Sequence, residues 1–260
     1  MTSVHHLQSK LKILKLGGML LTLESRLSQA QKEPLGFVDF LEMLLEDEIQ
    51  RRANKKLALR VQRARFEAVK TFEEFDFGFD PGIPIQQVRD LATCAFVQQH
   101  ASVIICGPVG AGKTHIAQSL GYEACKRGYG VLFTKTSHLL RALGGGRADG
   151  TWEERFKGYL KPHVLILDDF AMKELTAPQA EDLYELIDQR TGKASFIVTS
   201  NRSPQDWYPL FPNPVLAESA LDRLVNASHH VVLTGKSYRS KLRPGQQPKP
   251  IDEGGETDVA

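Results

Sequence analysis

Cysteine is scarce in this chain of 260 residues, which holds three: Cys94, Cys106 and Cys125. Three is an odd number, and the spacing is not that of metal ligands. The pattern therefore excludes a disulfide-stapled secreted scaffold and a cysteine-based zinc site, and it favours a reducing compartment. The eight histidines are scattered along the sequence, so we expect no zinc site from them either.

Long apolar runs and an excess of one charge are also missing. No run approaches the ~20 apolar residues that span a bilayer, and the N-terminus lacks a signal-peptide core. We therefore expect a cytoplasmic protein with no membrane partner. The net charge of +2 excludes a polycation, so any nucleic-acid surface must come from local clustering of cations. The length suits one medium domain and a smaller one.

A glycine-rich stretch follows the short apolar run Val103–Cys106. It matches G-x-x-x-x-G-K-[ST], the spacing of a phosphate-binding loop (P-loop), and precedes a predicted helix over His115–Lys126. Glycines let backbone N–H groups approach phosphate oxygens, the lysine reaches the outer phosphates, and the threonine hydroxyl is placed for Mg²⁺. The alternative is a glycine-rich turn that binds nothing. The predicted nucleotide-binding residues are Gly107, Pro108, Val109, Gly110, Ala111, Gly112, Lys113, Thr114 and His115.

Two acids follow a second apolar run, Val164–Leu167. Such a run is typical of a buried parallel strand that delivers side chains to the carboxyl edge of a sheet. We expect Asp168 to hold Mg²⁺ through water, with Thr114, and Asp169 to polarise the attacking water. The alternative is a strand end with two capping acids.

A polar amide follows another predicted strand, Ser195–Thr199. At that edge Asn201 can reach the γ-phosphate or orient the attacking water. The alternative is that Asn201 starts the turn before Ser203 and Pro204.

Two helices are predicted before residue 70. Leucines recur at helical spacing within residues 1–32, and Pro34 separates this helix from a longer one over Leu35–Phe66. The expected apolar seam of the longer helix is Leu41, Leu45, Ile49, Leu57 and Val61.

The longer helix has an acidic first half, and residues 51–65 hold seven cations and no acid. One interpretation is a solvated helix whose charges match its dipole. The other is a basic stripe along a phosphate backbone, since seven cations exceed what dipole matching needs; the charge pattern alone leaves both interpretations open. The predicted DNA-binding residues are Arg51, Arg52, Lys55, Lys56, Arg60 and Arg63.

Residues 71–84 alternate aromatic residues and then contain glycine and proline, which predicts a linker. Its phenylalanines either dock the linker on the second domain or, in one case, flank an adenine base. We therefore expect two domains and a tail. Residues 1–70 form a helical domain for DNA binding or oligomerisation, residues 71–240 form the nucleotide-binding domain, and residues 241–260 form a disordered tail. Further predicted elements are a helix over Ile85–His100, a strand over Val131–Thr134, a helix to Leu143, a loop over Gly144–Gly146 and a last strand over Val231–Leu233.

Together the motifs resemble the IstB family, the transposition helper ATPases of bacterial insertion sequences, which are AAA+ relatives of the helicase loader DnaC. The similarity spans nearly the whole chain and omits only the tail. The residues that carry it are the P-loop, the acid pair, the strand end at Asn201, and the runs Ala220–Leu224 and Gly235–Arg239.

The resemblance implies an α/β fold: a P-loop AAA+ ATPase with a five-stranded parallel sheet sandwiched by helices, the P-loop strand central, after a small all-helical N-terminal domain. It implies that ATP and Mg²⁺ bind between subunits of a homo-oligomer that assembles on duplex DNA and acts on a transposase. By motif position, Arg223 is expected to be the arginine finger and Arg239 the sensor arginine; each could also be an ordinary helix-end or surface-pair arginine. Asp169 stands where glutamate is usual in AAA+ proteins, which leaves the rate of hydrolysis open.

Three alternatives remain open at this stage. A DnaC-type replicative helicase loader would prefer single-stranded DNA to duplex. A small-molecule kinase would place phosphate on an acceptor rather than on water. A DNA-binding module with structural ATP would show no DNA-stimulated hydrolysis.

Overall fold

The computed structural model describes residues 2–33, 35–235 and 237–238; the predictions for Arg239 and for the tail lie outside the described residues. The described strands form one five-stranded parallel sheet in the order β2-β3-β4-β1-β5. The strand that precedes the P-loop was expected at the centre of the sheet, but it is fourth of the five strands, because β4 lies between it and β3. The strands are β1 (Ser102–Cys106), β2 (Val131–Lys135), β3 (Val164–Asp168), β4 (Ser195–Ser200) and β5 (Ser228–Val232).

The three interior strands are apolar because helices cover both faces of the sheet. Every residue of β1, β3 and β4 is buried, whereas the edge strands β2 and β5 mix buried with accessible residues. A strand buried on both faces reads as a continuous apolar run, which is why these strands were visible in the sequence. At the carboxyl edge of the sheet, Cys106 of β1 pairs with Ser200 of β4, and Lys135 of β2 pairs with Asp168 of β3.

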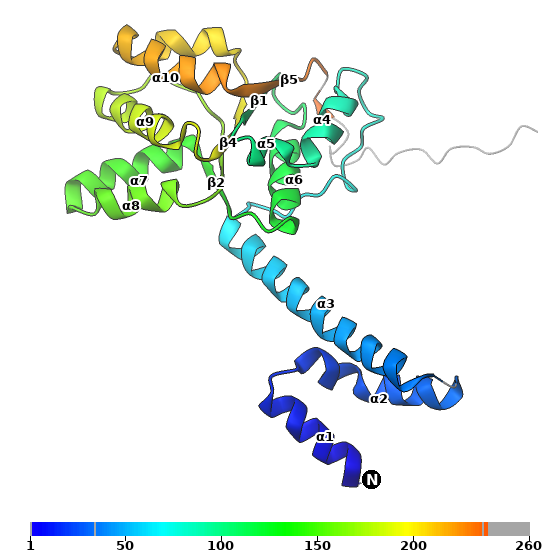
Figure 1. Ribbon diagram of the computed structural model, residues 1–260. Coiled ribbons are helices and arrows are strands. Elements are labelled where there is room, and N and C mark those ends of the chain that lie inside the picture. Colours follow the sequence, from blue (N-terminus) through cyan, green and yellow to red (C-terminus); the bar gives the residue numbers. More distant parts are fainter. Residues whose placement is uncertain (1, 34, 236, 239–260) are drawn as a thin grey trace, which may run out of the picture.

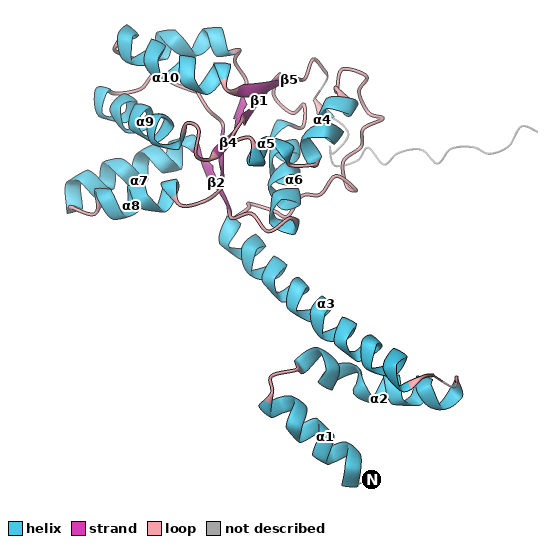
Figure 2. Cartoon of the chain, viewed as in Figure 1, coloured by secondary structure: helices cyan, strands magenta, loops and turns pink. Residues whose placement is uncertain are grey.

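Helices pack on the two faces of the sheet (Figures 1 and 2). One hydrophobic cluster joins one face of the sheet to α4 (Ile85–Ala92), α5 (Ala95–Gln98) and α6 (Lys113–Lys126). A second cluster joins the other face to the remaining helices of this domain. These are α7 (Thr136–Asp149), α8 (Trp152–Leu160), α9 (Ala177–Arg190), the 3₁₀ helix η1 (Pro204–Leu210) and α10 (Pro214–Asn226).

The N-terminal helices are α1 (Thr2–Ile13), α2 (Gly17–Lys32) and α3 (Phe37–Ala64). Figure 1 shows α3 running away from the sheet, with α2 beside its far half and α1 beyond α2. Helices α2 and α3 approach closely at Gly18, whose added Cβ would lie 2.5 Å from Glu48 Cα. The small core of this unit is Leu11, Met19, Leu23 and Leu44.

The N-terminal prediction needs two corrections. Residues 2–32 form two helices where the sequence predicted one, because the chain turns at residues 14–16, where Lys15 has a positive φ of 57°. The seam of α3 is covered only at Leu57 and Val61, which are half-buried and pack against the sheet domain. Its first half is exposed, because α2 covers the neighbouring face of α3 instead. The exposed seam residues are Leu41, Leu45 and Ile49.

The expected loop over Gly144–Gly146 is wrong: these glycines lie inside α7. Gly146 is needed there because a Cβ would lie 2.8 Å from the Cα of Trp152, at the start of α8. The helix expected over Ile85–His100 is instead split into α4 and α5 at Cys94, which has φ 61°. The last strand begins three residues earlier than predicted, at Ser228. Among the described helices, none combines the length and the apolar character needed to cross a lipid bilayer.

Arg190 is buried in this core, with 1% of its surface exposed. Its Nη1 donates hydrogen bonds to the carbonyl oxygens of Tyr159, Leu160 and Pro162 at 2.9–3.2 Å, and its Nη2 donates to that of Ser195 at 2.8 Å. Burial lowers the pKa of this guanidinium to about 10. One side chain therefore ties the end of α8, the start of β3 and the start of β4 together.

We expect Arg190→Met to lower the free energy of unfolding by at least about 3 kcal/mol, because it leaves four buried or half-buried carbonyl oxygens without this donor. Urea denaturation measures the change. The control is Lys157→Met on the exposed face of α8, which should change the value by about 0.5 kcal/mol or less. A loss below about 1 kcal/mol for Arg190→Met would show that these carbonyl oxygens do not depend on it.

Candidate functional site

The P-loop lies between β1 and α6, at the carboxyl edge of the sheet. Gly110 and Gly112 have positive φ of 82° and 94°, which glycine adopts without strain. A Cβ on Gly110 would also collide with the Ser237 side chain, and the Tyr238 N–H donates to the Gly110 carbonyl oxygen at 3.0 Å. Residues 237–238 therefore rest on the loop, and two of its glycines are required by the geometry.

Lys113 is enclosed by the P-loop and only 7% exposed. Its Nζ donates to the carbonyl oxygens of Gly107 and Pro108, each at 2.8 Å. A buried ammonium in a ring of backbone groups is positioned for an anion at the start of α6, where the helix dipole is positive.

A buried carboxylate connects the P-loop with two strands. Thr114 Oγ1 donates to Asp168 Oδ1 at 2.9 Å, and Thr199 Oγ1 donates to the same oxygen at 2.5 Å. Burial raises the pKa of Asp168, which is 2% exposed, while the two hydroxyl donors oppose that rise. The Asp168 carbonyl oxygen is held as well, by the hydroxyl of Thr136 at 3.0 Å.

The oxygens of Thr114 and Asp168 fit a magnesium ion. Both are hard oxygen ligands at one point beside the P-loop. The described residues contain no group of three or more histidine, cysteine, aspartate or glutamate side chains that could hold a metal. An ion here would take its other ligands from phosphate and water, which is how Mg²⁺ is commonly bound.

Thr199 is a site residue that the sequence analysis missed. Besides donating to Asp168, its Oγ1 accepts the N–H of Asp169 at 3.1 Å, so it fixes both acids. Asp169 itself has φ 55°, a left-handed conformation that turns the chain away from β3. The sequence held one signal for Thr199. It lies two positions before Asn201, and alternate residues of a strand share one face of the sheet. Its strand, β4, pairs with the strand that leads to the acids.

Asn201 follows β4 and lines a groove with Gly107 and Pro108, so the structure brings it beside the P-loop, where the sequence analysis expected it. Its amide nitrogen lies 3.5 Å from Met172 Sδ.

An aromatic pocket adjoins the P-loop on the linker side. Phe75 contacts Gly112 and His115, and the centroids of the Phe75 and His115 rings are 5.0 Å apart. The ring centroids of Phe79 and Tyr238 are 4.8 Å apart. His115 Nε2 lies 2.9 Å from the Thr71 carbonyl oxygen, and burial lowers the pKa of this imidazole. The linker docks on the domain, as one interpretation predicted, and Phe75 and Phe79 also line this pocket.

Arg223 lies apart from this constellation, on α10. Its guanidinium donates to Ser219 Oγ at 2.8 Å, forms a long ion pair of 3.5 Å with Asp188, and lies over the Tyr184 ring. Its polar partners among the described residues belong to α9 and α10, and 37% of its side chain is exposed. The structure therefore presents Arg223 outward rather than to the P-loop of its own chain.

The predicted DNA-binding cations lie along α3. Arg51 covers Gly17, Arg52 pairs with Glu48 at 2.6 Å, and Arg60 donates to the Cys125 carbonyl oxygen at 3.4 Å. Lys55, Lys56 and Arg63 are exposed. The structure thus brings all six to one helix, although two of them also make contacts that hold the N-terminal unit together.

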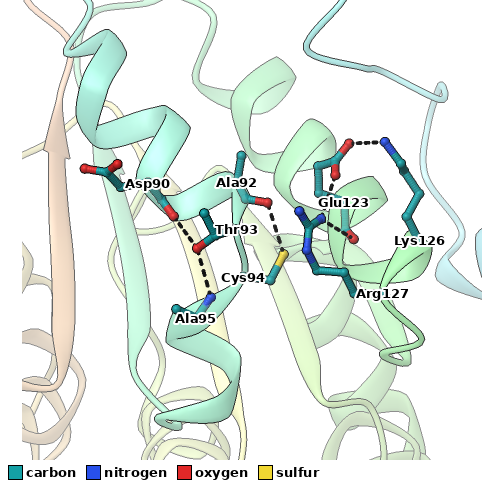
Figure 3. Close-up of polar contacts among 8 residues, drawn as sticks. All are labelled: Asp90, Ala92, Thr93, Cys94, Ala95, Glu123, Lys126 and Arg127. Carbon is teal, nitrogen blue, oxygen red and sulfur yellow. Dashed lines mark hydrogen bonds and ion pairs between the residues drawn. The ribbon is translucent and has the colours of Figure 1, made fainter.

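A groove of about 620 Å³, the α3–α6 groove, separates α3 from the end of α6. Its cations are Arg52, Lys56 and Arg60 from α3, and Lys126 and Arg127 from α6 and the residue after it. Figure 3 shows Lys126 and Arg127 both turned to Glu123, at 2.7 and 2.6 Å. The positive charge on the α6 wall is thus partly neutralised within the chain.

We expect Lys113→Ala to lower ATP affinity at least roughly tenfold, because the loop loses the one cation that it encloses. Titration with a fluorescent ATP analogue measures the dissociation constant. Lys126→Ala, which removes an equal charge from the other end of α6, should bind ATP like the parent protein. Equal affinities for the parent and Lys113→Ala would show that this ammonium does not meet the nucleotide.

Solved structures share this fold. The crystal structure of DnaI has a TM-score of 0.57 and 20% identity over 64% of this chain and 91% of its own. The DnaC helicase loader has a TM-score of 0.52 and 22% identity over 58% of this chain and 88% of its own. AMPPCP-bound DnaA from Aquifex aeolicus has a TM-score of 0.54 and 21% identity over 68% of this chain and 54% of its own. At these identities the likeness concerns the fold alone.

Sequence relatives are much closer. An ATP-binding protein of an insertion sequence in Mycobacterium tuberculosis is 53% identical over 92% of this chain and 96% of its own. The ATP-binding protein of insertion sequence IS21 in Pseudomonas aeruginosa is 38% identical over 92% and 90%. The model of the family of IstB-like ATP binding proteins matches residues 9–245. The chain therefore belongs to the IstB-like ATP binding proteins of insertion sequences.

Proposed function

We propose that this protein is an ATPase that binds duplex DNA, assembles on it as a homo-oligomer and assists a transposase. The observation that carries the proposal is the combination, in one chain, of the Lys113–Thr114–Asp168 site with the basic helix α3. Relatives from insertion sequences support a role in DNA transposition. The reaction is ATP + water → ADP + phosphate.

The site residues divide the work. Lys113 and the backbone N–H groups of the P-loop bind the phosphates, while Phe75 and Phe79 line the pocket for the base. Thr114 and Asp168 hold Mg²⁺, which when bound neutralises charge on the phosphates.

Asp169 and Asn201, which follow β3 and β4, orient the attacking water in this proposal. We assign Arg239 the role of the sensor arginine from its motif position; it lies outside the described residues.

Arg223 acts on a neighbouring subunit in this proposal. Its guanidinium is held by a hydrogen bond to Ser219 and by a long ion pair of 3.5 Å with Asp188. A γ-phosphate on the next subunit can therefore compete for it. ATP then joins subunits, and hydrolysis removes the charge that holds the joint. Several copies of α3 on one duplex multiply weak phosphate contacts by effective concentration.

The second candidate is a replicative helicase loader, which the fold similarity to DnaC and DnaI favours. Binding of labelled duplex and single-stranded DNA of equal length separates the two functions. We expect preference for the duplex; preference for the single strand would support the loader.

We expect Arg223→Ala to retain ATP binding and to lose turnover by roughly 10³-fold, together with ATP-dependent assembly. A phosphate-release assay and light scattering with ATP and duplex DNA measure both losses. Arg141→Ala, an exposed arginine on α7, is the matched control and should keep both activities. Normal turnover of Arg223→Ala would refute the role in trans.

For α3, we expect replacement of Arg51, Arg52, Lys55 and Lys56 by alanine to flatten the log–log salt dependence of DNA affinity. The slope should change by up to about 3.6, since each phosphate contact contributes about 0.9. Fluorescence anisotropy of labelled duplex over a NaCl series measures the slope. A control variant loses the same charge at Lys10, Lys12, Lys173 and Lys193, and its slope should stay at the parent value.

An unchanged slope for the α3 variant would mean that this face is only solvated. Circular dichroism checks that the helices persist, because Arg51 and Arg52 also contact the N-terminal unit.

A further inference from the structure

A second basic groove, the β2-edge groove, lies where α3 meets the sheet. It measures about 650 Å³ and is bounded by the end of α3, the edge strand β2, the middle of α7, and α8 with the turn after it. Figure 1 shows the C-terminal end of α3 reaching the sheet beside β2. Its charged lining is Arg63, Arg65, Arg155 and Lys161, with His163 beside them and no acid among the lining residues.

The cations of this groove are less neutralised than those of the α3–α6 groove. Arg155 pairs with Asp149 at 2.6 Å. Arg63, Arg65 and Lys161 are exposed and form no ion pair with any residue that the structure describes. Three cations therefore lie around one concave surface that has no acidic lining residue. Their mutual repulsion is relieved when an anion binds there.

Neutral donors complete the lining. β2 pairs only with β3 among the described strands, so the other side of its backbone stays open toward the groove. Burial raises the pKa of Tyr159, although Arg65 and Arg155 oppose this, so its hydroxyl remains a proton donor at neutral pH. Arginine, backbone N–H and hydroxyl groups are the donors that proteins use for phosphate oxygens.

The two grooves run into each other. Arg60 lines the α3–α6 groove and Arg63, less than one turn later, lines the β2-edge groove. On the opposite wall Gly128 belongs to the first and Gly130 to the second. The basic part of α3 spans roughly 18 Å, about five base pairs, and the β2-edge groove extends that track onto the ATPase domain.

We propose that the β2-edge groove binds the phosphodiester backbone of the duplex that α3 holds, with Arg65 and Lys161 as its main phosphate contacts. The inference rests on the proposed DNA binding. It places DNA against β2, whose last residue Lys135 pairs in register with Asp168. Bound DNA would thereby touch the strand next to the candidate acids.

The first test removes the contacts. We expect Arg65→Ala with Lys161→Ala to flatten the salt slope of duplex affinity by about 1.8, for two phosphates. The control, Lys173→Ala with Lys193→Ala, removes equal charge from exposed positions outside both grooves and should keep the parent slope.

The second test places a side chain in the groove at Gly158, one of its lining residues. Gly158 lies within α8, and a Cβ there meets nothing within 4 Å, so longer side chains fit without disturbing the fold. We expect Gly158→Glu to weaken duplex binding roughly tenfold relative to Gly158→Gln, because the two differ in charge but hardly in shape. Gly144→Glu, on α7 and equally open, should bind like the parent.

The outcomes separate this inference from the proposed function. If the α3 variant loses salt dependence while Arg65→Ala with Lys161→Ala keeps the parent slope, and Gly158→Glu binds like Gly158→Gln, the groove carries no phosphate and the inference is overturned. The inference is also overturned if these groove variants lose binding to a protein partner while their DNA binding is unchanged. That result would assign the groove to an acidic peptide. If the α3 variant also keeps its slope, the proposed DNA binding itself fails.

Discussion

The site depends on a single buried carboxylate oxygen. Asp168 Oδ1 accepts hydrogen bonds from Thr114, at the start of α6, and from Thr199, on β4. Three segments far apart in the sequence are thereby held at one point of the sheet edge. Hydrogen bonds to a charged group contribute about 1.5–3 kcal/mol each and leave the carboxylate little freedom. The P-loop, the acid pair and the strand that leads to Asn201 thus form one rigid unit.

That unit is connected to the basic helix. Glu67, three residues beyond α3, pairs with Lys135 at 2.8 Å, and Lys135 stands in register with Asp168. Phe66 packs against Phe133 of the same strand, with ring centroids 6.5 Å apart. The end of α3 is therefore fastened to β2 by an apolar contact and by an ion pair.

The linker itself belongs to the domain it follows. Phe72, Phe75 and Phe77 pack against the core and against one another, and His115 Nε2 donates a hydrogen bond to the Thr71 carbonyl oxygen. Residues 71–84 hence form one wall of the pocket beside Gly112. A stretch without helix or strand is ordered here because its aromatic side chains bury apolar surface.

The sequence by itself determined the parallel sheet, the P-loop, the acid pair and the place of Asn201. Each is a local pattern whose meaning depends on spacing: buried strands read as apolar runs, and their carboxyl ends meet at one edge. Only the tertiary structure decided the role of Thr199, the aromatic pocket and the β2-edge groove, because each joins residues from distant segments. It also decided that Gly144–Gly146 is helical, since the approach of α8 at Trp152 requires a glycine at 146. Leu41, Leu45 and Ile49 show the same limit: helical periodicity identifies an apolar stripe, whereas the neighbouring helix decides whether the stripe is covered.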